Sequence, residues 1–295
     1  MVSIICLCYN HKDYVEEALS SVFNQTYKNW ELIIVDDASV DGSVEKIKHF
    51  LANYYEINND IASRVKTIFL DKNKGNCTAF NEGFKISKGE YIIDLAADDK
   101  FENDKLEKQI KALENADSQT GVCFTNAVLI DEKSEQIGNY YYDWYKKQPK
   151  DGYIFKELVR AGGMICSPTM LIKREVLEEL GGYDESLSYE DYDFWVRSAR
   201  NWKYVFLSEN LTFYRKINHS HSSTFKKKNN PHLYSTFKVC QKAFLLCQSN
   251  DEYKALSISV LYHFKESIKF KNYRAAKGFL KLIKKLIFKR VKFYQ

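Results

Sequence analysis

The chain is poor in residues that interrupt regular structure: its 295 residues include only 3 prolines and 12 glycines. This scarcity excludes collagen-like and proline-rich disordered proteins. No run of about 18 apolar residues is present, so we expect no membrane-spanning helix. The motifs G-x-G-x-x-G and G-x-x-x-x-G-K-[ST] are also absent, and a dinucleotide site and a P-loop are therefore unsupported.

CxxC pairs are missing as well, although the chain has seven cysteines. We therefore expect reduced, mostly buried thiols, and we interpret Cys6 and Cys8 as strand residues rather than metal ligands. The first residues lack the basic segment and the small-residue cleavage site of a signal peptide. Together these features predict a cytoplasmic protein.

Charge is divided unevenly along the chain. Residues 1–225 hold 27 Lys and Arg against 36 Asp and Glu, a net charge of −9. Residues 226–295 hold 17 against 3, a net charge of +14. An acidic body needs cations near its carboxylates, and a basic tail favours an anionic surface.

Apolar runs alternate with helical patterns in the first half. The expected strands and helices alternate in chain order, at 2–9, 11–24, 31–35, around 47–51, 65–70, 75–86, 90–95, 103–113 and 122–130. This order predicts an α/β fold with a doubly wound, mainly parallel sheet flanked by helices. The strands are continuously apolar, which indicates that both faces of the sheet are covered.

The second half is less regular. We expect helices at 153–160, 174–180 and 190–199, and strands at 169–172, 204–207 and 211–214. Gly181-Gly182 is typical of a helix C-cap. From about residue 232 the pattern is wholly helical. We therefore expect one domain at 1–225 and a basic helical extension at 226–295.

Two pairs of aspartates follow strands of the expected sheet, Asp36-Asp37 after the second strand and Asp98-Asp99 after the fourth. Ligands of open parallel sheets bind beyond the carboxyl ends of the strands. Two acidic pairs at one edge repel each other unless a cation lies between them, and Mg²⁺ or Mn²⁺ prefers such oxygen ligands. For either pair alone, the alternative is a turn in which Asp accepts nearby backbone N–H groups.

A third acidic cluster, at residues 190–193, precedes a helix. Ser188 and Asp191 fit an S-x-x-D capping box, which alone would explain both residues. The functional alternative is a general base that takes a proton from an attacking hydroxyl. The pattern leaves both interpretations open.

Many of these segments resemble, in the same order, motifs of family 2 glycosyltransferases with the GT-A fold. The resemblance extends over roughly residues 1–223. Its motifs lie at residues 2–10, 21–27, 31–43, 73–75, 81–83, 88–92, 98–99, 105–109, 181–185, 190–197 and 214–219.

The resemblance implies an inverting, hexosyltransferase-type enzyme of bacterial polysaccharide assembly. It would move a sugar from a nucleotide-diphosphate donor, most often a UDP-sugar, to a hydroxyl of a glycan or polyprenyl-linked glycan. The nucleotide-sugar half would be about 1–117 and the acceptor half about 118–225. Asp191 would be the base. The donor would be bound by Leu7, Cys8, Tyr9, Asn10, Asp37, Asn73, Gly75, Asp98 and Arg215. Mn²⁺ or Mg²⁺ would be held by Asp98, Asp99 and His219.

The chain departs from the family pattern at the metal-binding motif. The family often has Asp-x-Asp-Asp, whereas this chain has Ala96-Ala97-Asp98-Asp99. It therefore stays open which of Asp98 and Asp99 chelates the ion. One alternative is a catalytically impaired binding or scaffold subunit. Another is a sugar nucleotidyltransferase, but residues 10–12 do not form the glycine-rich phosphate loop that it needs.

The basic tail contains an amphipathic helical pattern at residues 278–291. Its apolar face is formed by Phe279, Leu282, Ile283, Leu286 and Ile287. Such a helix can lie on anionic lipid, which predicts peripheral attachment to the inner face of the cell membrane. The alternatives are packing on the chain's own domain or a homodimer contact. We expect no nucleic-acid partner, because the body is acidic.

Overall fold

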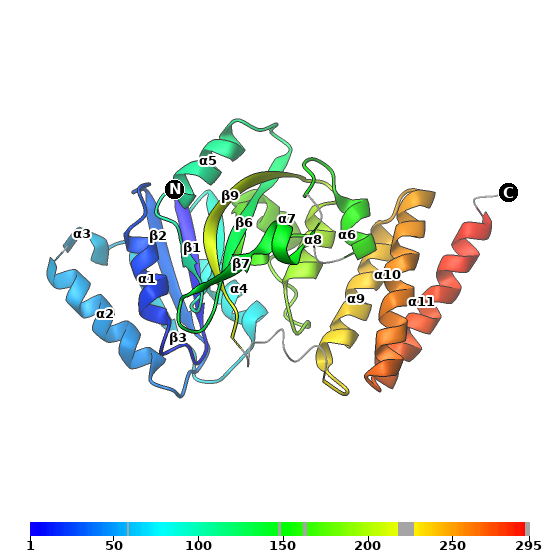
Figure 1. Cartoon of the computed structure of the whole chain (residues 1–295), viewed down its shortest axis with the longest axis horizontal. Coiled ribbons are helices and arrows are strands. Elements are labelled where there is room, and N and C mark those ends of the chain that lie inside the picture. Colours follow the sequence, from blue (N-terminus) through cyan, green and yellow to red (C-terminus); the bar gives the residue numbers. More distant parts are fainter. Residues whose placement is uncertain (58, 147–148, 162–163, 218–226, 293–295) are drawn as a thin grey trace. The chain divides into compact units, whose positions relative to one another are not determined.

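A computed structural model describes residues 1–295 except 58, 147–148, 162–163, 218–226 and 293–295 (Figure 1). The chain divides into two compact units, each described separately here. Unit 1 comprises Met1–Gly152, Ile165–Tyr183 and Lys203–Lys216, and unit 2 comprises Tyr153–Met164, Asp184–Trp202 and Ile217–Gln295. Unit 2 includes two segments that precede residue 225, and the domain boundary after residue 225 stays a prediction.

Unit 1 is built on a nine-stranded sheet, counted over the described residues, in the order β3-β2-β1-β4-β8-β6-β9-β5 with β7 beside β6. The strands are β1 (Val2–Cys8), β2 (Trp30–Asp36), β3 (Val65–Phe69), β4 (Tyr91–Ala96), β5 (Lys100–Phe101), β6 (Thr120–Ile130), β7 (Gln136–Asn139), β8 (Leu171–Lys173) and β9 (Lys203–Arg215).

Parallel pairing holds for β1 to β4, as expected, and also joins β6 to β9. The pairs β4–β8, β6–β8, β6–β7 and β5–β9 are antiparallel, so the sheet is mixed beyond β4. The two strands expected at 204–207 and 211–214 form the single strand β9. Ser208 and Glu209 are extra residues in its pairing with β6, because Thr125 pairs with Leu207 and Asn126 with Asn210. A bulge of this kind lets the strand continue through a polar segment.

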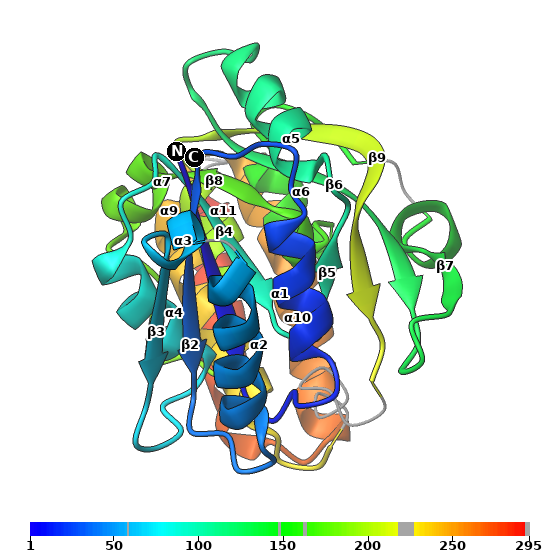
Figure 2. The same ribbon diagram turned by 90° about the vertical axis from the view of Figure 1, so that its left-hand side faces the viewer.

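The helices of unit 1 cover both faces of the parallel strands. They are α1 (Val15–Phe23), α2 (Ser43–Ile57), α3 (Asn59–Ala62), α4 (Asn76–Ile86), α5 (Lys105–Glu114) and α7 (Arg174–Leu180), with short turns η1 (Tyr140–Trp144) and η2 (Ser167–Thr169). Figure 2 shows α1 and α2 in front of the sheet, where their apolar side chains share one core with Ile4 and Cys6 of β1. On the other face, α4 lies so close that a Cβ at Gly83 would be 2.7 Å from Cγ2 of Ile5.

Unit 2 is helical over its described residues. Its helices are α6 (Phe155–Ala161), α8 (Asp191–Ser198), α9 (Pro231–Leu246), α10 (Asn250–Lys269) and α11 (Tyr273–Lys292). The start of α9 is set by Asn230, whose side chain accepts from the amide of Leu233. The start of α10 is set by a capping box between Ser249 and Glu252.

The apolar face expected to meet lipid is largely buried inside unit 2. Phe279, Leu282 and Leu286 are at most 3% exposed. The centre of the Phe279 ring lies 5.5 Å from the ring centre of Phe237 on α9 and 6.0 Å from that of His263 on α10. The assignment of this face to lipid is therefore wrong for these three side chains, because a three-helix core uses the same spacing as a surface helix.

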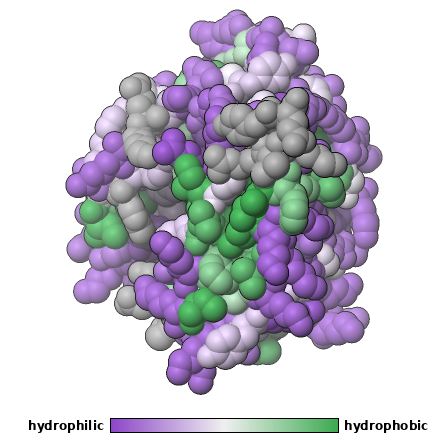
Figure 3. All heavy atoms as spheres, turned by 90° about the vertical axis from the view of Figure 1, so that its right-hand side faces the viewer, coloured by the Kyte–Doolittle hydropathy of each residue, from purple (hydrophilic) through white to green (hydrophobic). Residues whose placement is uncertain are grey.

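An apolar surface that shares Ile287 with the predicted face is exposed on α10 and α11. It is formed by Ile258, Leu261, Tyr262, Leu280, Ile287 and Phe288. Figure 3 looks at the α11 side and shows apolar side chains gathered in the middle of this face among hydrophilic ones. Across the described residues, no helix combines the length and apolarity that crossing a membrane requires.

All seven cysteines lie within the described residues and are buried thiols, as expected. Burial is the main cause that raises the pKa of Cys8, Cys123, Cys240 and Cys247 to about 12. At neutral pH these side chains therefore remain protonated and serve as packing residues.

Candidate active site

The carboxyl ends of three parallel strands meet at one edge of the sheet in unit 1. In the register of β1, Cys8 pairs with Asp36 of β2, and Leu7 pairs with Ala96 of β4. The segments that follow these strands carry Asp37 and Asp98, and they consequently begin side by side. This edge is where an open parallel sheet binds its ligands.

In the first acidic pair Asp36 makes a turn, as the simpler interpretation expected, whereas Asp37 binds a loop that is distant in the sequence. Asp36 accepts hydrogen bonds from the amide and the hydroxyl of Ser39, at 2.8 and 2.6 Å. The two oxygens of Asp37 accept from the amides of Lys74 and Gly75, at 2.7 and 2.8 Å. Asp37 thereby fixes the loop that enters α4, and its contact with a nucleotide stays a prediction.

The end of β1 offers two exposed side chains. Leu7 and Cys8 are buried, whereas Tyr9 and Asn10 are exposed. Asn10 has a φ of 57°, and its side-chain oxygen accepts from the amide of Val40 at 2.9 Å. Asn73, in the loop before α4, is also exposed. These positions leave Tyr9, Asn10 and Asn73 accessible to a ligand at this edge.

The second acidic pair is asymmetric. Asp99 is buried, and its Oδ1 accepts from the amide of Arg215 at 2.8 Å. Burial and the neighbouring Asp98 raise the pKa of Asp99 well above its usual range. The side chain of Asp98 is partly exposed and lies 3.9 Å from Nε2 of His11, whose Nδ1 is buried without a hydrogen-bond partner among the described residues. Asp98 is the carboxylate of the pair that a ligand can reach.

The described residues fit a divalent ion only if the substrate completes its coordination. They contain no group of three or more His, Cys, Asp and Glu side chains arranged to hold a metal. His219 lies outside the described residues. Mg²⁺ in nucleotide enzymes is commonly held by one or two carboxylates together with substrate phosphates, so a single accessible Asp98 is compatible with that mode.

Arg215 connects the acidic pair to two other segments, α1 and residues 131–134. It is buried, its Nε donates to the carbonyl of Asp98 at 2.8 Å, and Nη2 donates to Glu17 at 3.1 Å. Nη1 donates to the carbonyl of Asp131 and to Ser134, both at 2.9 Å. With most of its N–H groups engaged, Arg215 holds the Asp98 segment in place, and direct contact with a diphosphate stays a prediction.

Sequence reasoning missed a cation beside this pair. Lys216 follows Arg215 at the end of β9. Burial lowers the pKa of Lys216 to about 8, although the acids Asp99 and Asp98 and the thiol of Cys166 oppose that shift. Lys216 lies within the segment 214–219 that resembles the family, directly after Arg215, but the resemblance assigned it no role.

Asp191 is the first residue of α8 in unit 2 and is partly buried. Its Oδ1 accepts from the amide of Tyr192 at 2.6 Å. Burial and the adjacent Glu190 raise the pKa of Asp191 to about 7. Among the described residues Asp191 forms no ion pair, whereas Asp193 is buried between Arg197 and Lys242, each at 2.6 Å. The carboxylate of Asp193 therefore forms two structural ion pairs, whereas the carboxylate of Asp191 forms none with the described residues.

Of the two interpretations of this cluster, the capping box is wrong. The N-cap residue of α8 is Glu190, and no side chain caps it. The Ser188 hydroxyl instead lies 2.9 Å from Nδ1 of His232 and 3.0 Å from the hydroxyl of Ser235, both on α9. A partner far away in the sequence thus replaces the local one that the S-x-x-D pattern indicates.

The sequence matches a known family at the same segments. Residues 3–181 match the model of glycosyl transferase family 2. The chain belongs to glycosyltransferase family 2.

Curated relatives agree with this assignment. An uncharacterised glycosyltransferase of Methanocaldococcus jannaschii is 31% identical over 242 residues, which are 81% of this chain and 79% of that protein. One of Rickettsia typhi is 34% identical over 203 residues, 68% of this chain but only 59% of that protein. The putative teichuronic acid biosynthesis glycosyltransferase TuaG of Bacillus subtilis is 38% identical over 111 residues, 38% of this chain and 41% of TuaG.

Solved structures of glycosyltransferases share the fold. TarS (residues 1–349) of S. aureus in complex with UDP-GlcNAc gives a TM-score of 0.66 at 17% identity, over 91% of this chain and 73% of that one. The mannosyltransferase PcManGT of Pyrobaculum calidifontis, in complex with GDP-Man and Mn²⁺, gives 0.62 at 18% identity, over 95% and 73%. The family 2 enzyme described here thus has the α/β GT-A fold, with a helical C-terminal region.

Proposed function

We propose that this glycosyltransferase transfers a hexose from a UDP-sugar to a hydroxyl of a glycan or lipid-linked glycan, with inversion at the anomeric carbon. The observation that carries the proposal is Asp191, a carboxylate without an ion pair among the described residues, whose pKa is raised to about 7. A base with a pKa near the working pH combines the correct protonation state with sufficient basicity.

In the proposed reaction, the acceptor hydroxyl gives its proton to a carboxylate oxygen of Asp191. The acceptor oxygen forms a bond to the anomeric carbon while the bond from that carbon to the donor's phosphate oxygen breaks. The electron pair of the broken bond leaves with the nucleotide diphosphate. Because the displacement is a single step from the opposite side, the configuration inverts.

At the donor site, Asp98 would hold Mn²⁺ or Mg²⁺ together with the diphosphate. When bound, the ion would offset the negative charge that develops on the leaving group. Lys216 would add a second positive charge, while Arg215 keeps the Asp98 segment in position. Tyr9, Asn10 and Asn73 would contact the nucleotide from the end of β1 and the loop before α4.

We further propose that the enzyme works peripherally at an anionic membrane on the cytoplasmic side. The support is the exposed apolar surface on α10 and α11 together with exposed Lys281, Lys284, Lys285 and Lys289 of α11. Apolar contact and lysine charge act together when a helix lies in a lipid interface. An acceptor linked to polyprenyl would lie at the same surface.

The test measures UDP release by the purified full chain from several UDP-sugars with Mn²⁺, with and without glycan acceptors. Turnover that is lost in Asp191→Asn but kept in Ser188→Ala supports the proposal. A chain that binds UDP but neither transfers the sugar nor hydrolyses the donor would instead be a scaffold subunit. The replacement of the first family acid by Ala96 gives that alternative its support.

A further inference from the structure

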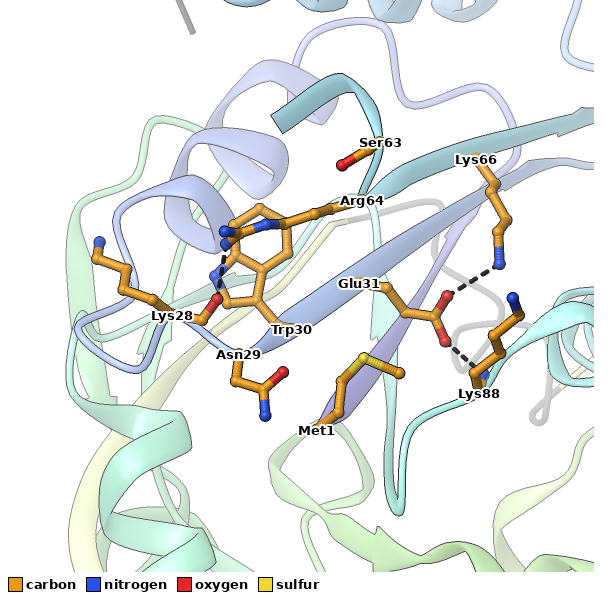
Figure 4. A pocket seen from close by; sticks show the side chains of 9 residues that line it. All are labelled: Met1, Lys28, Asn29, Trp30, Glu31, Ser63, Arg64, Lys66 and Lys88. Carbon is orange, nitrogen blue, oxygen red and sulfur yellow. Dashed lines mark hydrogen bonds and ion pairs between the residues drawn. The ribbon is translucent and has the colours of Figure 1, made fainter. Parts of the chain in front are cut away.

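A cationic pocket lies at the opposite end of the sheet of unit 1. It has a volume of about 480 Å³, and its lining includes Lys28, Trp30, Arg64, Lys66 and Lys88 (Figure 4). Trp30 and Arg64 stand at the starts of β2 and β3, whereas the donor edge lies beyond the strand ends. Since β1 has seven residues, roughly 20 Å separates the two edges. We propose that this pocket binds a phosphate-bearing ligand at a site separate from the donor site.

Positive charge dominates the lining. Four cationic side chains face a single carboxylate, that of Glu31. Lys66 pairs with Glu31 at 2.9 Å, and Glu31 also accepts from Ser3 at 2.7 Å and from the amide of Lys88. Burial opposes ionisation of Glu31, but these hydrogen bonds outweigh it and hold its pKa below its usual range. Lys28, Arg64 and Lys88 keep charges that no described carboxylate neutralises.

Arg64 is held in a defined position. Its Nη1 donates to the carbonyl of Lys28 at 2.7 Å, and its guanidinium lies 5.9 Å from the centre of the Trp30 ring. A fixed, planar guanidinium with remaining N–H groups can bind a phosphate through two parallel hydrogen bonds. The exposed Lys28 and Lys88 have long stems and can turn toward the same anion.

A buried donor in the wall of the pocket has no acceptor. Trp30 is 3% exposed, and among the described residues its Nε1 has no hydrogen-bond partner. Figure 4 shows the indole beside the guanidinium of Arg64, with its nitrogen toward Lys28. Because this nitrogen is shielded from solvent, the indole serves as a wall of the pocket and as a support for the guanidinium of Arg64.

The size and chemistry of the pocket select the ligand class. Its volume is within the range of small-molecule sites, about 300–1,000 Å³, and exceeds what one inorganic ion fills. Three cations without a carboxylate partner match a doubly charged phosphate group better than a single carboxylate. The ligand is therefore a phosphate-bearing molecule, either soluble or a lipid headgroup.

The probe is inorganic pyrophosphate, titrated calorimetrically into the full chain in EDTA. Because the proposed donor site binds a diphosphate through an ion held by Asp98, removing the metal weakens binding of the probe at that site. The test variant combines Arg64→Gln with Lys88→Gln. Its matched control combines Lys111→Gln with Lys156→Gln, which removes two exposed lysines that form no ion pair with described residues. We expect about tenfold weaker binding in the test variant, and less than about twofold in the control.

Trp30→Phe provides a second measurement. It keeps an aromatic ring beside Arg64 but removes the fluorophore, so pyrophosphate affinity should change less than about twofold while the change in tryptophan fluorescence on binding should shrink. Circular dichroism checks that each variant is folded. Equal affinities of the test and control variants, or no binding at millimolar concentration, would overturn the proposal.

Vesicles of phosphatidylglycerol distinguish the two sources of phosphate. If the ligand is a lipid headgroup, Arg64→Gln with Lys88→Gln weakens vesicle binding and pyrophosphate binding together. If the ligand is soluble, only pyrophosphate binding weakens, because vesicles would still meet α11.

Discussion

At the scale of single residues, ionisation of the proposed base Asp191 should affect activity and stability in opposite directions. Asp191→Asn keeps the shape and a hydrogen-bond acceptor but cannot take a proton, so the transfer rate should fall about 10²–10⁴-fold with donor affinity unchanged. Ser188→Ala, the control, should keep most turnover. A transfer rate above about a tenth of the parent would assign the base to another carboxylate, with Glu190 next.

The pH dependence follows from the raised pKa of about 7. The base must be deprotonated, so kcat/KM should rise with pH through about 7. The pKa of Asp191 is also higher in the folded state than in the unfolded state, where an Asp has a pKa of about 3.9. Ionisation of Asp191 therefore lowers the free energy of unfolding as pH rises above about 4. Asp191→Asn should therefore be more stable than the parent at pH 8 and equal at pH 4. Thermal melts at both pH values test this.

The acidic pair gives a second prediction at this scale. Asp98→Asn should weaken Mn²⁺-dependent UDP binding by about tenfold or more, because Asp98 is the accessible carboxylate. Asp99→Asn should change it little, since an amide oxygen can still accept from the Arg215 amide and the carboxyl is buried. Calorimetry with Mn²⁺ and with EDTA compares the two variants. Equal losses would show that both carboxylates bind the ion.

At the scale of elements, the close contact between α4 and the end of α7 explains two sequence motifs. Asn81 donates to the carbonyl of Tyr183 and accepts from its amide, both at 2.9 Å. Gly182 has a φ of 80°, and a Cβ there would lie 2.6 Å from Oδ1 of Asn81. The motifs at 81–83 and 181–185 therefore contact each other, with Asn81 packed against Gly182 and Tyr183.

This contact predicts unequal effects for neighbouring glycines. Gly182→Ala should lower the free energy of unfolding by about 2–4 kcal/mol, because it combines backbone strain with a clash. Gly181→Ala, at a φ of 69° with no atom within 4 Å of its Cβ, should cost only about 1–2 kcal/mol. Chemical denaturation measures both. Equal costs would mean that strain alone acts at Gly182.

Elements with local signals were predicted well. The helix at 174–180 and its glycine cap match α7, because helix periodicity and a positive φ are encoded in neighbouring residues. The short strands β5 and β7 were not expected, since only their pairing with β9 and β6 defines them. Ser188 was misread for the same reason: its partners lie on α9. At the candidate site, the locations of the two aspartate pairs could be predicted because both pairs follow strands. The burial of Asp99 and the hydrogen bonds of Arg215 could not, because they depend on tertiary packing.

At the scale of the whole molecule, the basic tail contributes buried side chains to a helical core and also presents an exposed apolar surface. Ile287→Ser with Phe288→Ser should reduce sedimentation with phosphatidylglycerol vesicles and leave the melting temperature unchanged, because both side chains are exposed. Phe279→Ser should instead lower the melting temperature, since it removes a buried ring. Vesicle binding should weaken as salt rises from 0.05 to roughly 0.5 M. Equal binding to neutral vesicles would contradict electrostatic attachment.

Because its seven thiols are buried, the folded chain should react slowly with alkylating reagents, whereas the unfolded chain should react readily. Alkylating reagents attack thiolates, and a thiol with a pKa near 12 supplies almost none at pH 8. Iodoacetamide should therefore label the native enzyme slowly and all seven cysteines once the chain opens, which mass spectrometry can count. The sites labelled first would show which part of the molecule opens first. An unfolded population would also acquire mismatched disulfides in air, so recovery after heating should depend on a reducing agent.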